Sequence, residues 1–333
     1  MTRQLTILLL ALLLAGLVTL ATGLGYIHIP VAQVIEIATA KVTGMPLADS
    51  VDSRFPVIVS DIRLPRIIAA TLVGGGLAVA GAVFQAILLN PLADPYTLGV
   101  SSGAAFGASL AIVLSLFGIA LPTVWTVPAF AFAFAIATLV AVFALSSADN
   151  RFSSNTLILA GVIVAAILSA GIGFIKYMAD EEVGIIIFWL MGSLVGKTWQ
   201  EVLLVLTIFY FARDLNIMAL GEKTADSLGV ESVRIRKLLL AAATLITAGC
   251  VAVSGIIGFI GLIVPHLLRL VIGADNRFLL PASFLAGALL LLAADTVTRA
   301  LLPHEIPIGV LTALIGGPFF CYIFRARQLG RRR

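Results

Sequence analysis

The chain has 333 residues, of which 61% are hydrophobic and 11% are charged, and its mean hydropathy is +1.14. A soluble domain carries roughly 25% charged residues, so this composition excludes a soluble protein and indicates an integral membrane protein. The net charge of +4 does not indicate nucleic-acid binding, because basic residues beside membrane spans suit the anionic headgroups of the lipid surface.

The apolar segments predict an all-α polytopic membrane protein with about ten transmembrane helices in a single transmembrane domain, residues 1–333. A bilayer core about 30 Å thick needs roughly 20 apolar residues per helix, and the segments lack the period-two alternation of barrel strands. The first segment could be a signal peptide, but no clean A-x-A cleavage site follows it, so we count it as a helix. The predicted spans are 5–24, 62–89, 98–120, 124–145, 155–177, 199–213, 235–254, 256–272, 280–302 and 306–324.

Cysteine and histidine usage predicts neither a disulfide framework nor a metal site. Cys250 and Cys321 both lie inside predicted spans, far apart and without a C-x-x-C pattern. The histidines, His28, His266 and His304, are scattered along the chain. We expect no cofactor.

The basic residues predict the orientation of the chain. Ten spans put both termini on one side, and the basic C-terminal sequence RARQLGRRR places that side in the cytoplasm by the positive-inside rule. On this topology 14 of the 21 lysines and arginines are cytoplasmic. The loop 213–234, which contains ALGEKTADSLGV at 219–230, is then cytoplasmic as well.

Small residues recur at intervals of four in the region 63–111. Such spacing puts them on one stripe of a helix, where they let two helix backbones approach closely in lipid. The two stripes are Gly74, Ala78 and Ala82, then Gly99, Gly103 and Gly107. Between them, NPLADPY is a predicted turn in which Asn90 and Asp94 form local hydrogen bonds.

Proline and glycine interrupt two late spans, GFIGLIVPH at 258–266 and EIPIGVLTALIGGPFF at 305–320. Breaks around Pro265 and Pro307 are tolerated at membrane depth only where protein or a water-filled cavity satisfies the freed backbone groups, so they favour a transport protein. Asp295 and Arg299 lie four residues apart with the acidic residue first, which is the order that favours an ion pair along a helix. The role of this pair could be structural or functional.

The sequence GSLVGKT at 192–198 does not form a phosphate-binding loop. The motif G-x-x-x-x-G-K-[ST] requires four residues between its glycines, whereas three separate Gly192 from Gly196. Any ATP-driven transport would therefore need a separate ATPase subunit.

The polar segment 219–230 is predicted to form a short helix of about two turns that Gly229 ends. Its small side chains and flanking charges suit insertion into a groove of a soluble partner. A solvated surface helix is the alternative interpretation.

Four separated motifs resemble those of the FecCD family of ABC-importer permeases. They are RLPR with the glycine-rich sequence that follows it, ALGEKTADSLGV, GFIGLIVPHLLR and EIPIGVLTALIGGPFF. The resemblance covers residues 60–324. It implies a cobalamin-type permease in the bacterial inner membrane that works with a second copy of itself and two cytoplasmic ATPase subunits. A periplasmic or lipid-anchored binding protein would deliver a metal chelate, with ferric siderophore expected before haem or cobalamin.

The resemblance also implies roles for particular residues. Gly221, Glu222, Ala225, Leu228 and Gly229 would contact the ATPase. Arg63, Arg66 and Arg299 would pair with acids of the binding protein, or else anchor the chain at the lipid interface. Gly74, Gly99, Gly103, Gly107, Pro265 and Pro307 would serve helix packing and the pathway.

The resemblance does not imply which residues contact the substrate. The candidates, which lie around the second and fifth helices and in the segment 188–193, are mostly apolar. Two other functions remain open at this point. An ion-coupled secondary transporter would need charges at the membrane midplane, and Asp295 is the only obvious candidate. A membrane scaffold without transport activity would not need broken helices.

Overall fold

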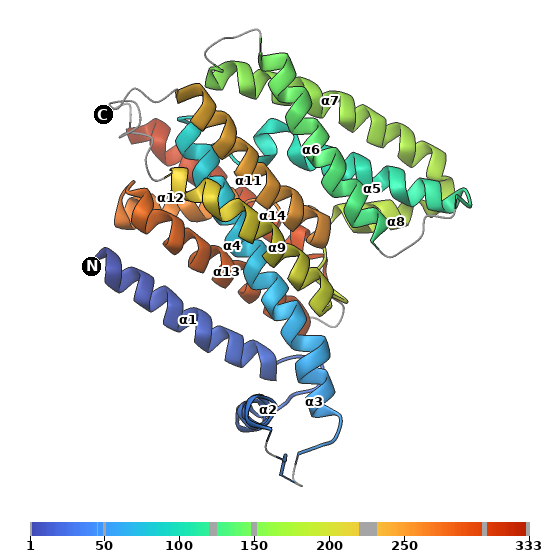
Figure 1. Ribbon diagram of the computed structural model, residues 1–333, viewed down its shortest axis with the longest axis vertical. Helices are drawn as coiled ribbons and strands as arrows, with labels where there is room; N and C mark the ends of the chain where they lie inside the picture. Colours follow the sequence, from blue (N-terminus) through green and yellow to red (C-terminus); the bar gives the residue numbers. More distant parts are fainter. Residues whose placement is uncertain are drawn as a thin grey trace.

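The computed structural model describes residues 2–44, 46–48, 51–119, 125–147, 152–219, 232–301 and 305–330. Figure 1 shows the elements in order. The α-helices are α1 (Arg3–Gly23), α2 (Val31–Thr43), α3 (Phe55–Val57), α4 (Leu64–Ile87), α5 (Val100–Leu116), α6 (Thr126–Ser146), α7 (Ser154–Ala179), α8 (Val183–Leu190), α9 (Trp199–Ala219), α11 (Ser232–Ser254), α12 (Ile260–Ile272), α13 (Asn276–Leu301) and α14 (Ile308–Gly330). A π-helical segment, η1 (Ile58–Arg63), joins α3 to α4, and the 3-10 helices are η2 (Pro95–Leu98) and η3 (Asp180–Glu182).

The predicted all-α membrane fold is confirmed. The described residues form helices and no strand. Six helical segments are long and apolar enough to cross a membrane, and four shorter apolar helices accompany them. These segments correspond to the ten predicted spans, α1, α4 to α7, α9 and α11 to α14. The beginning of α1 and the end of α14 lie at the same end of the bundle, at the left of Figure 1.

Helix α4 lies at the centre of the bundle, where 20 of its 24 residues are buried. Its glycines let neighbouring backbones approach it closely. A Cβ added to Gly74 would lie 2.4 Å from the carbonyl oxygen of Gly287 in α13, and a Cβ added to Gly81 would lie 1.9 Å from that of Gly261 in α12. Close approach of this kind substitutes for the hydrophobic driving force that lipid does not supply.

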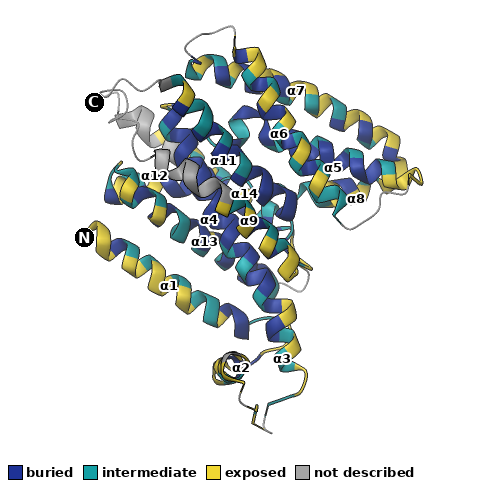
Figure 2. Cartoon of the chain, in the orientation of Figure 1, coloured by how far each residue is buried: buried dark blue, intermediate teal, exposed yellow. Residues whose placement is uncertain are grey.

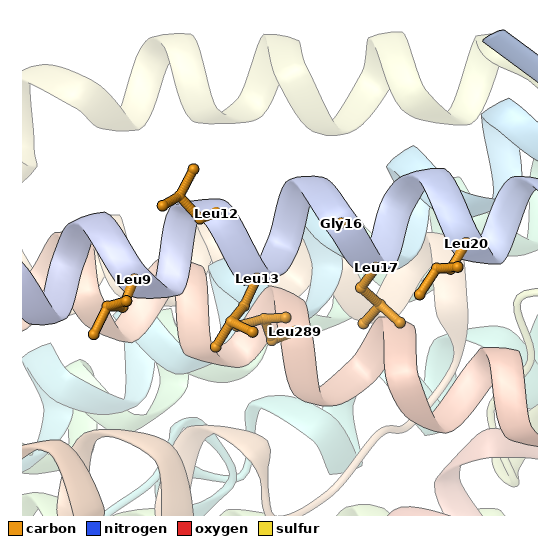
Figure 3. A pocket seen from close by; sticks show the side chains of 7 residues that line it. All are labelled: Leu9, Leu12, Leu13, Gly16, Leu17, Leu20 and Leu289. Atoms are coloured by element: carbon orange, nitrogen blue, oxygen red, sulfur yellow. The ribbon is translucent and has the colours of Figure 1, made fainter. Parts of the chain in front are cut away.

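Helix α1 lies at the edge of the bundle, and its outward side is exposed (Figure 2). In the most apolar 18-residue stretch of α1, only 17% of the residues are buried inside the protein. Its leucines line a shallow apolar pocket together with Leu289 of α13 (Figure 3). This surface suits contact with lipid acyl chains.

Gly99 does not belong to the stripe predicted for it. It precedes α5 with φ +75°, and a Cβ there would lie 3.1 Å from the carbonyl oxygen of Gly161 in α7. Gly103 and Gly107 lie within α5 and face Phe134 and Phe130 of α6. Gly99 is the N-cap of α5, where its left-handed conformation ends η2 and its carbonyl oxygen accepts a hydrogen bond from Gly103 N (3.0 Å).

The turn before α5 has the local hydrogen bonds that its sequence predicts. The Asp94 side chain accepts hydrogen bonds from the backbone N–H groups of Tyr96 and Thr97, which caps η2, and the Asn90 side chain accepts one from Leu92 N.

Two short helices were not predicted. Both α2 and α8 are too short to give a spanning signal.

Replacing Gly81 with Ala should destabilise the fold, because the new methyl group would overlap the backbone of α12 and overpacking of this kind costs about 1–3 kcal/mol. The apparent melting temperature in detergent measures the effect. The matched control is Gly173→Ala in α7, where an added Cβ meets no atom within 4 Å. Equal melting temperatures for the two variants would contradict the close contact of α4 with α12.

Candidate functional site

Three non-helical segments meet inside the bundle: 191–198 after α8, 255–259 between α11 and α12, and 305–307 before α14. Residues 191–193 bond through the backbone to the last residue of α11 and to the first two residues of α14. Ser193 N donates to Ser254 O (2.7 Å), Ile308 N to Gly192 O (3.1 Å), and Gly309 N to Met191 O (3.1 Å). These bonds satisfy backbone groups that a continuous helix would pair internally, as a low-dielectric surrounding requires.

A groove of about 530 Å³ opens beside this junction. Its lining is apolar, and Leu314 on its α14 side is 66% exposed. The segment 188–193, a predicted cavity candidate, contributes two of the lining residues. The full lining is Leu190, Met191, Ile256, Gly258, Gly309, Val310, Ala313, Leu314 and Pro318.

The segment 255–259 is held in an unusual conformation. Phe259 has φ +69°, a rare value for a residue with a side chain, and it packs against Gly316 of α14. A Cβ on Gly316 would lie 2.4 Å from the Cβ of Phe259. The hydroxyl of Tyr96 donates to the carbonyl oxygen of Ile257, so η2 also fixes this segment.

Pro265 lies inside α12, where it removes the N–H group that would bond the carbonyl oxygen of Gly261. Gln85 of α4 compensates: its Nε2 lies 3.1 Å from Leu262 O and 3.4 Å from Gly261 O. Arg269 donates to Oε1 of Gln85 and fixes the orientation of the amide. Sequence reasoning missed Gln85 and Arg269, although a glutamine in an apolar span is a signal of such a role.

Pro307 does not interrupt a helix. It immediately precedes α14, and its carbonyl oxygen accepts the first hydrogen bond of that helix from Val310 N (3.0 Å). The proline inside α14 is Pro318, which lines the groove.

A charged cluster lies at the N-terminal end of α4, at the opposite end of the helix from Gln85. Arg66 engages two carboxylates with its guanidinium group: Nε and Nη2 lie 3.0 and 2.9 Å from Oδ1 of Asp295, and Nη1 and Nη2 lie 3.1 and 2.9 Å from the oxygens of Glu305. The side chain of Asp295 is 1% exposed, whereas that of Glu305 is 40% exposed. Charge-assisted hydrogen bonds from two guanidinium nitrogens to one carboxylate are strong and have a specific geometry.

The predicted ion pair between Asp295 and Arg299 does not form. Asp295 pairs with Arg66 of α4 instead, because the guanidinium of Arg66 reaches both oxygens of the carboxylate. Arg299 donates to the carbonyl oxygen of Ala21 (2.7 Å). Its Nε and Nη1 are buried and have no hydrogen-bond partner within the part of the chain that the structure describes.

Arg63 is also turned into the protein. It is 5% exposed and donates to the carbonyl oxygens of Thr22 (2.7 Å) and Ile27. The structure therefore brings Arg63, Arg66 and Arg299 to one end of the bundle and engages each of them with the chain's own oxygens. Their role in docking stays a prediction.

The predicted ATPase-contact residues, Gly221, Glu222, Ala225, Leu228 and Gly229, lie outside the described residues. The sequence GSLVGKT occupies the link between α8 and α9. Burial lowers the pKa of Lys197 there, and the charge of Glu201 opposes this shift.

Residues 9–326 match the model of the FecCD transport family. The chain belongs to this family. The match extends beyond the region in which the sequence motifs lie and includes the groove and the arginine cluster.

Named relatives of this FecCD chain are permease proteins. The cobalamin import system permease protein BtuC of Halobacterium salinarum is 43% identical, with 85% of this chain and 78% of the relative covered. The molybdate import system permease protein MolB of Haemophilus influenzae is 39% identical, with 93% and 92% covered. A solved structure, described as a metal-chelate type ABC transporter in an inward-facing conformation, has a TM-score of 0.81 at 34% identity and covers 96% of this chain and 98% of its own.

Replacing Asp295 with Asn should destabilise this FecCD chain by about 3–5 kcal/mol, because Arg66 would lose the charge of its buried partner. The apparent melting temperature in detergent tests this. The control is Asp61→Asn, which removes an exposed carboxylate from η1. The double variant Arg66→Met/Asp295→Leu should recover part of the loss. If Asp295→Asn were as stable as Asp61→Asn, the pair would not contribute to the fold.

Proposed function

We propose that the chain is the permease subunit of an ATP-binding cassette importer that moves a metal chelate across the bacterial inner membrane. The observation that carries this proposal is the family match over residues 9–326, with relatives that are permeases of import systems. Both termini would be cytoplasmic, as the basic C-terminal sequence favours. The chain itself would hydrolyse no ATP.

The groove beside the broken helices supports the proposal as one half of a pathway. Non-helical backbone at membrane depth is tolerated where it is buried in protein or lines a water-filled cavity. The groove is open on the side of Leu314, so one copy does not enclose a substrate. A second copy of the chain would complete the enclosure.

The apolar lining of the groove also indicates which class of substrate it could accept. All nine residues that line the groove are apolar or glycine. A small oxyanion such as molybdate would need hydrogen-bond donors or positive charge, whereas a large chelate shields its metal inside an organic ligand and tolerates apolar walls. We therefore infer a metal chelate, with ferric siderophore first and haem or cobalamin as alternatives.

The importer requires two kinds of protein partner. Two cytoplasmic ATPase subunits would bind the segment 219–230 through Gly221, Glu222, Ala225, Leu228 and Gly229. A periplasmic or lipid-anchored binding protein would dock at the opposite end of the bundle.

Among the three arginines, Arg66 is already occupied by two carboxylates. Arg63 and Arg299 donate only to carbonyl oxygens and form no ion pair among the described residues. They are therefore the better candidates to receive an acid from the binding protein.

An ion-coupled secondary transporter is the rival assignment. It would need an acid that is free to bind the coupling ion. Asp295, the obvious candidate in the sequence, is instead occupied by Arg66 at one end of α4. This pairing favours the importer.

Reconstitution in vesicles with the partner ATPase and binding protein tests the proposal. Uptake of a ferric siderophore should require ATP and the ATPase, and should not respond to a proton gradient alone. Ala225→Arg should abolish co-purification with the ATPase while the permease elutes normally, because a long charged side chain cannot enter a groove that accepts a methyl group. Proton-driven uptake without the ATPase would overturn the proposal, whereas normal association of Ala225→Arg would overturn only the coupling assignment.

A further inference from the structure

Helix α2 lies where α1 ends and does not follow the direction of the spanning helices. Figure 1 shows α2 end-on, while α1 and α4 run across the picture, so α2 points in a different direction from both. Ile29 N donates to Gly23 O (3.0 Å), which holds the start of α2 directly beside the end of α1. Because α1 and α4 cross the membrane, α2 runs parallel to its surface.

The contacts of α2 place it at the edge of the hydrocarbon layer. The 21 residues of α1 span about 31 Å at 1.5 Å per residue, which matches a hydrocarbon core of about 30 Å. Arg63 bonds to Thr22 O at the end of α1 and so marks the same level. Val59, in the cluster that holds α2, precedes Arg63 by four residues, or roughly one helical turn. Surface helices that bind membranes lie at about this depth.

The large apolar residues Val31, Val34, Ile35 and Ile37 lie on one side of α2 at 100° per residue, a side that also carries Lys41 near the end of the helix. Half of that side is packed: Val34 and Ile37 are 6% and 3% exposed, in a cluster with Ile29 and Val59. The other half is open, with Val31 38% and Ile35 51% exposed. The linker that precedes α2 also contains two exposed apolar residues, Tyr26 and Ile27, which are 102% and 43% exposed.

The polar side of α2, in contrast, is partly covered by the chain itself. Oε1 of Glu36 accepts a hydrogen bond from Ala48 N (2.9 Å), and Leu47 packs against the cluster under α2. The returning segment 46–48 therefore contacts a charged residue and leaves Val31 and Ile35 uncovered. If α2 were surrounded by water, we would expect the returning segment to cover Val31 and Ile35 and to leave Glu36 exposed.

We propose that the open apolar side of α2, centred on Val31 and Ile35, binds the outer lipid leaflet and makes α2 a membrane-surface anchor. Lipid is the occupant because α2 begins beside the end of α1, where Ile29 N bonds to Gly23 O and Leu20 of the lipid-facing helix is 52% exposed. A fully exposed tyrosine, Tyr26, lies at the level where tyrosine and tryptophan concentrate in membrane proteins. This inference requires that the chain spans the membrane with its termini in the cytoplasm, and it does not depend on the importer assignment.

The anchor also has a consequence for the charged cluster. The carbonyl oxygen of Ile27, in the linker between α1 and α2, accepts a hydrogen bond from Arg63. A lipid-bound α2 therefore fixes the position of this carbonyl oxygen and, through it, the orientation of the Arg63 side chain.

Spin labels on the whole permease in phosphatidylcholine and phosphatidylglycerol vesicles test the proposal. In a background with Cys250→Ala and Cys321→Ala, single labels are placed by Ile35→Cys on the open apolar side and by Ala40→Cys on the opposite side. Leu12→Cys on α1, 60% exposed, provides the lipid reference. Power saturation then compares collisions with oxygen, which concentrates in lipid, with collisions with a water-soluble nickel chelate.

The proposal predicts that oxygen dominates for Ile35→Cys, as for Leu12→Cys, and that the nickel chelate dominates for Ala40→Cys. Elution of each variant at the parent volume shows that it is folded. Equal nickel accessibility at both α2 positions would overturn the proposal. Protection of Ile35→Cys only after addition of the binding protein would also overturn it and assign this surface to that partner.

Discussion

The rest of the structure depends on how the backbone groups at the three chain breaks are satisfied. A hydrocarbon surrounding offers no water to an unpaired N–H or C=O group. Residues 191–193 bond through the backbone to the last residue of α11 and to the first two residues of α14, next to the segments 255–259 and 305–307. One short segment therefore connects the end of α11 to the start of α14.

Close packing around α4 makes this junction possible. The contact of Gly81 with Gly261 sets the position at which α12 begins, and Gln85 bonds the carbonyl oxygens beside Pro265. At the other end of α4, Arg66 connects α13 and the segment before α14 through Asp295 and Glu305. One central helix thus positions both the groove and the charged end at which we propose that a partner docks.

The sequence predicted the ten spans because hydrophobicity and length alone decide whether a segment can cross a bilayer. Glycine marked the break at 255–259, but Pro265 lies inside the continuous helix α12 and Pro307 precedes α14 instead of interrupting it. The partner of Asp295 was not predictable from spacing: Arg299 is four residues away, whereas Arg66 is 229 residues away and is brought near only by the packing of α4 on α13. The membrane-surface position of α2 was missed because its 13 residues are too few to span and its apolar side is divided between protein contact and exposure.

The central claim is that the groove beside the junction is part of the transport pathway, and substitution of Leu314 tests it most directly. Leu314→Trp enlarges a side chain on the groove wall, and Leu159→Trp makes the same change at a similarly exposed position of α7, since the two leucines are 66% and 62% exposed. ATP-dependent chelate uptake is measured in vesicles that contain the permease, the ATPase and the binding protein. The account predicts that Leu314→Trp loses most of its uptake while still binding the ATPase, and that Leu159→Trp transports as the parent does. Uptake at the parent rate by Leu314→Trp would contradict the assignment of the groove to the pathway.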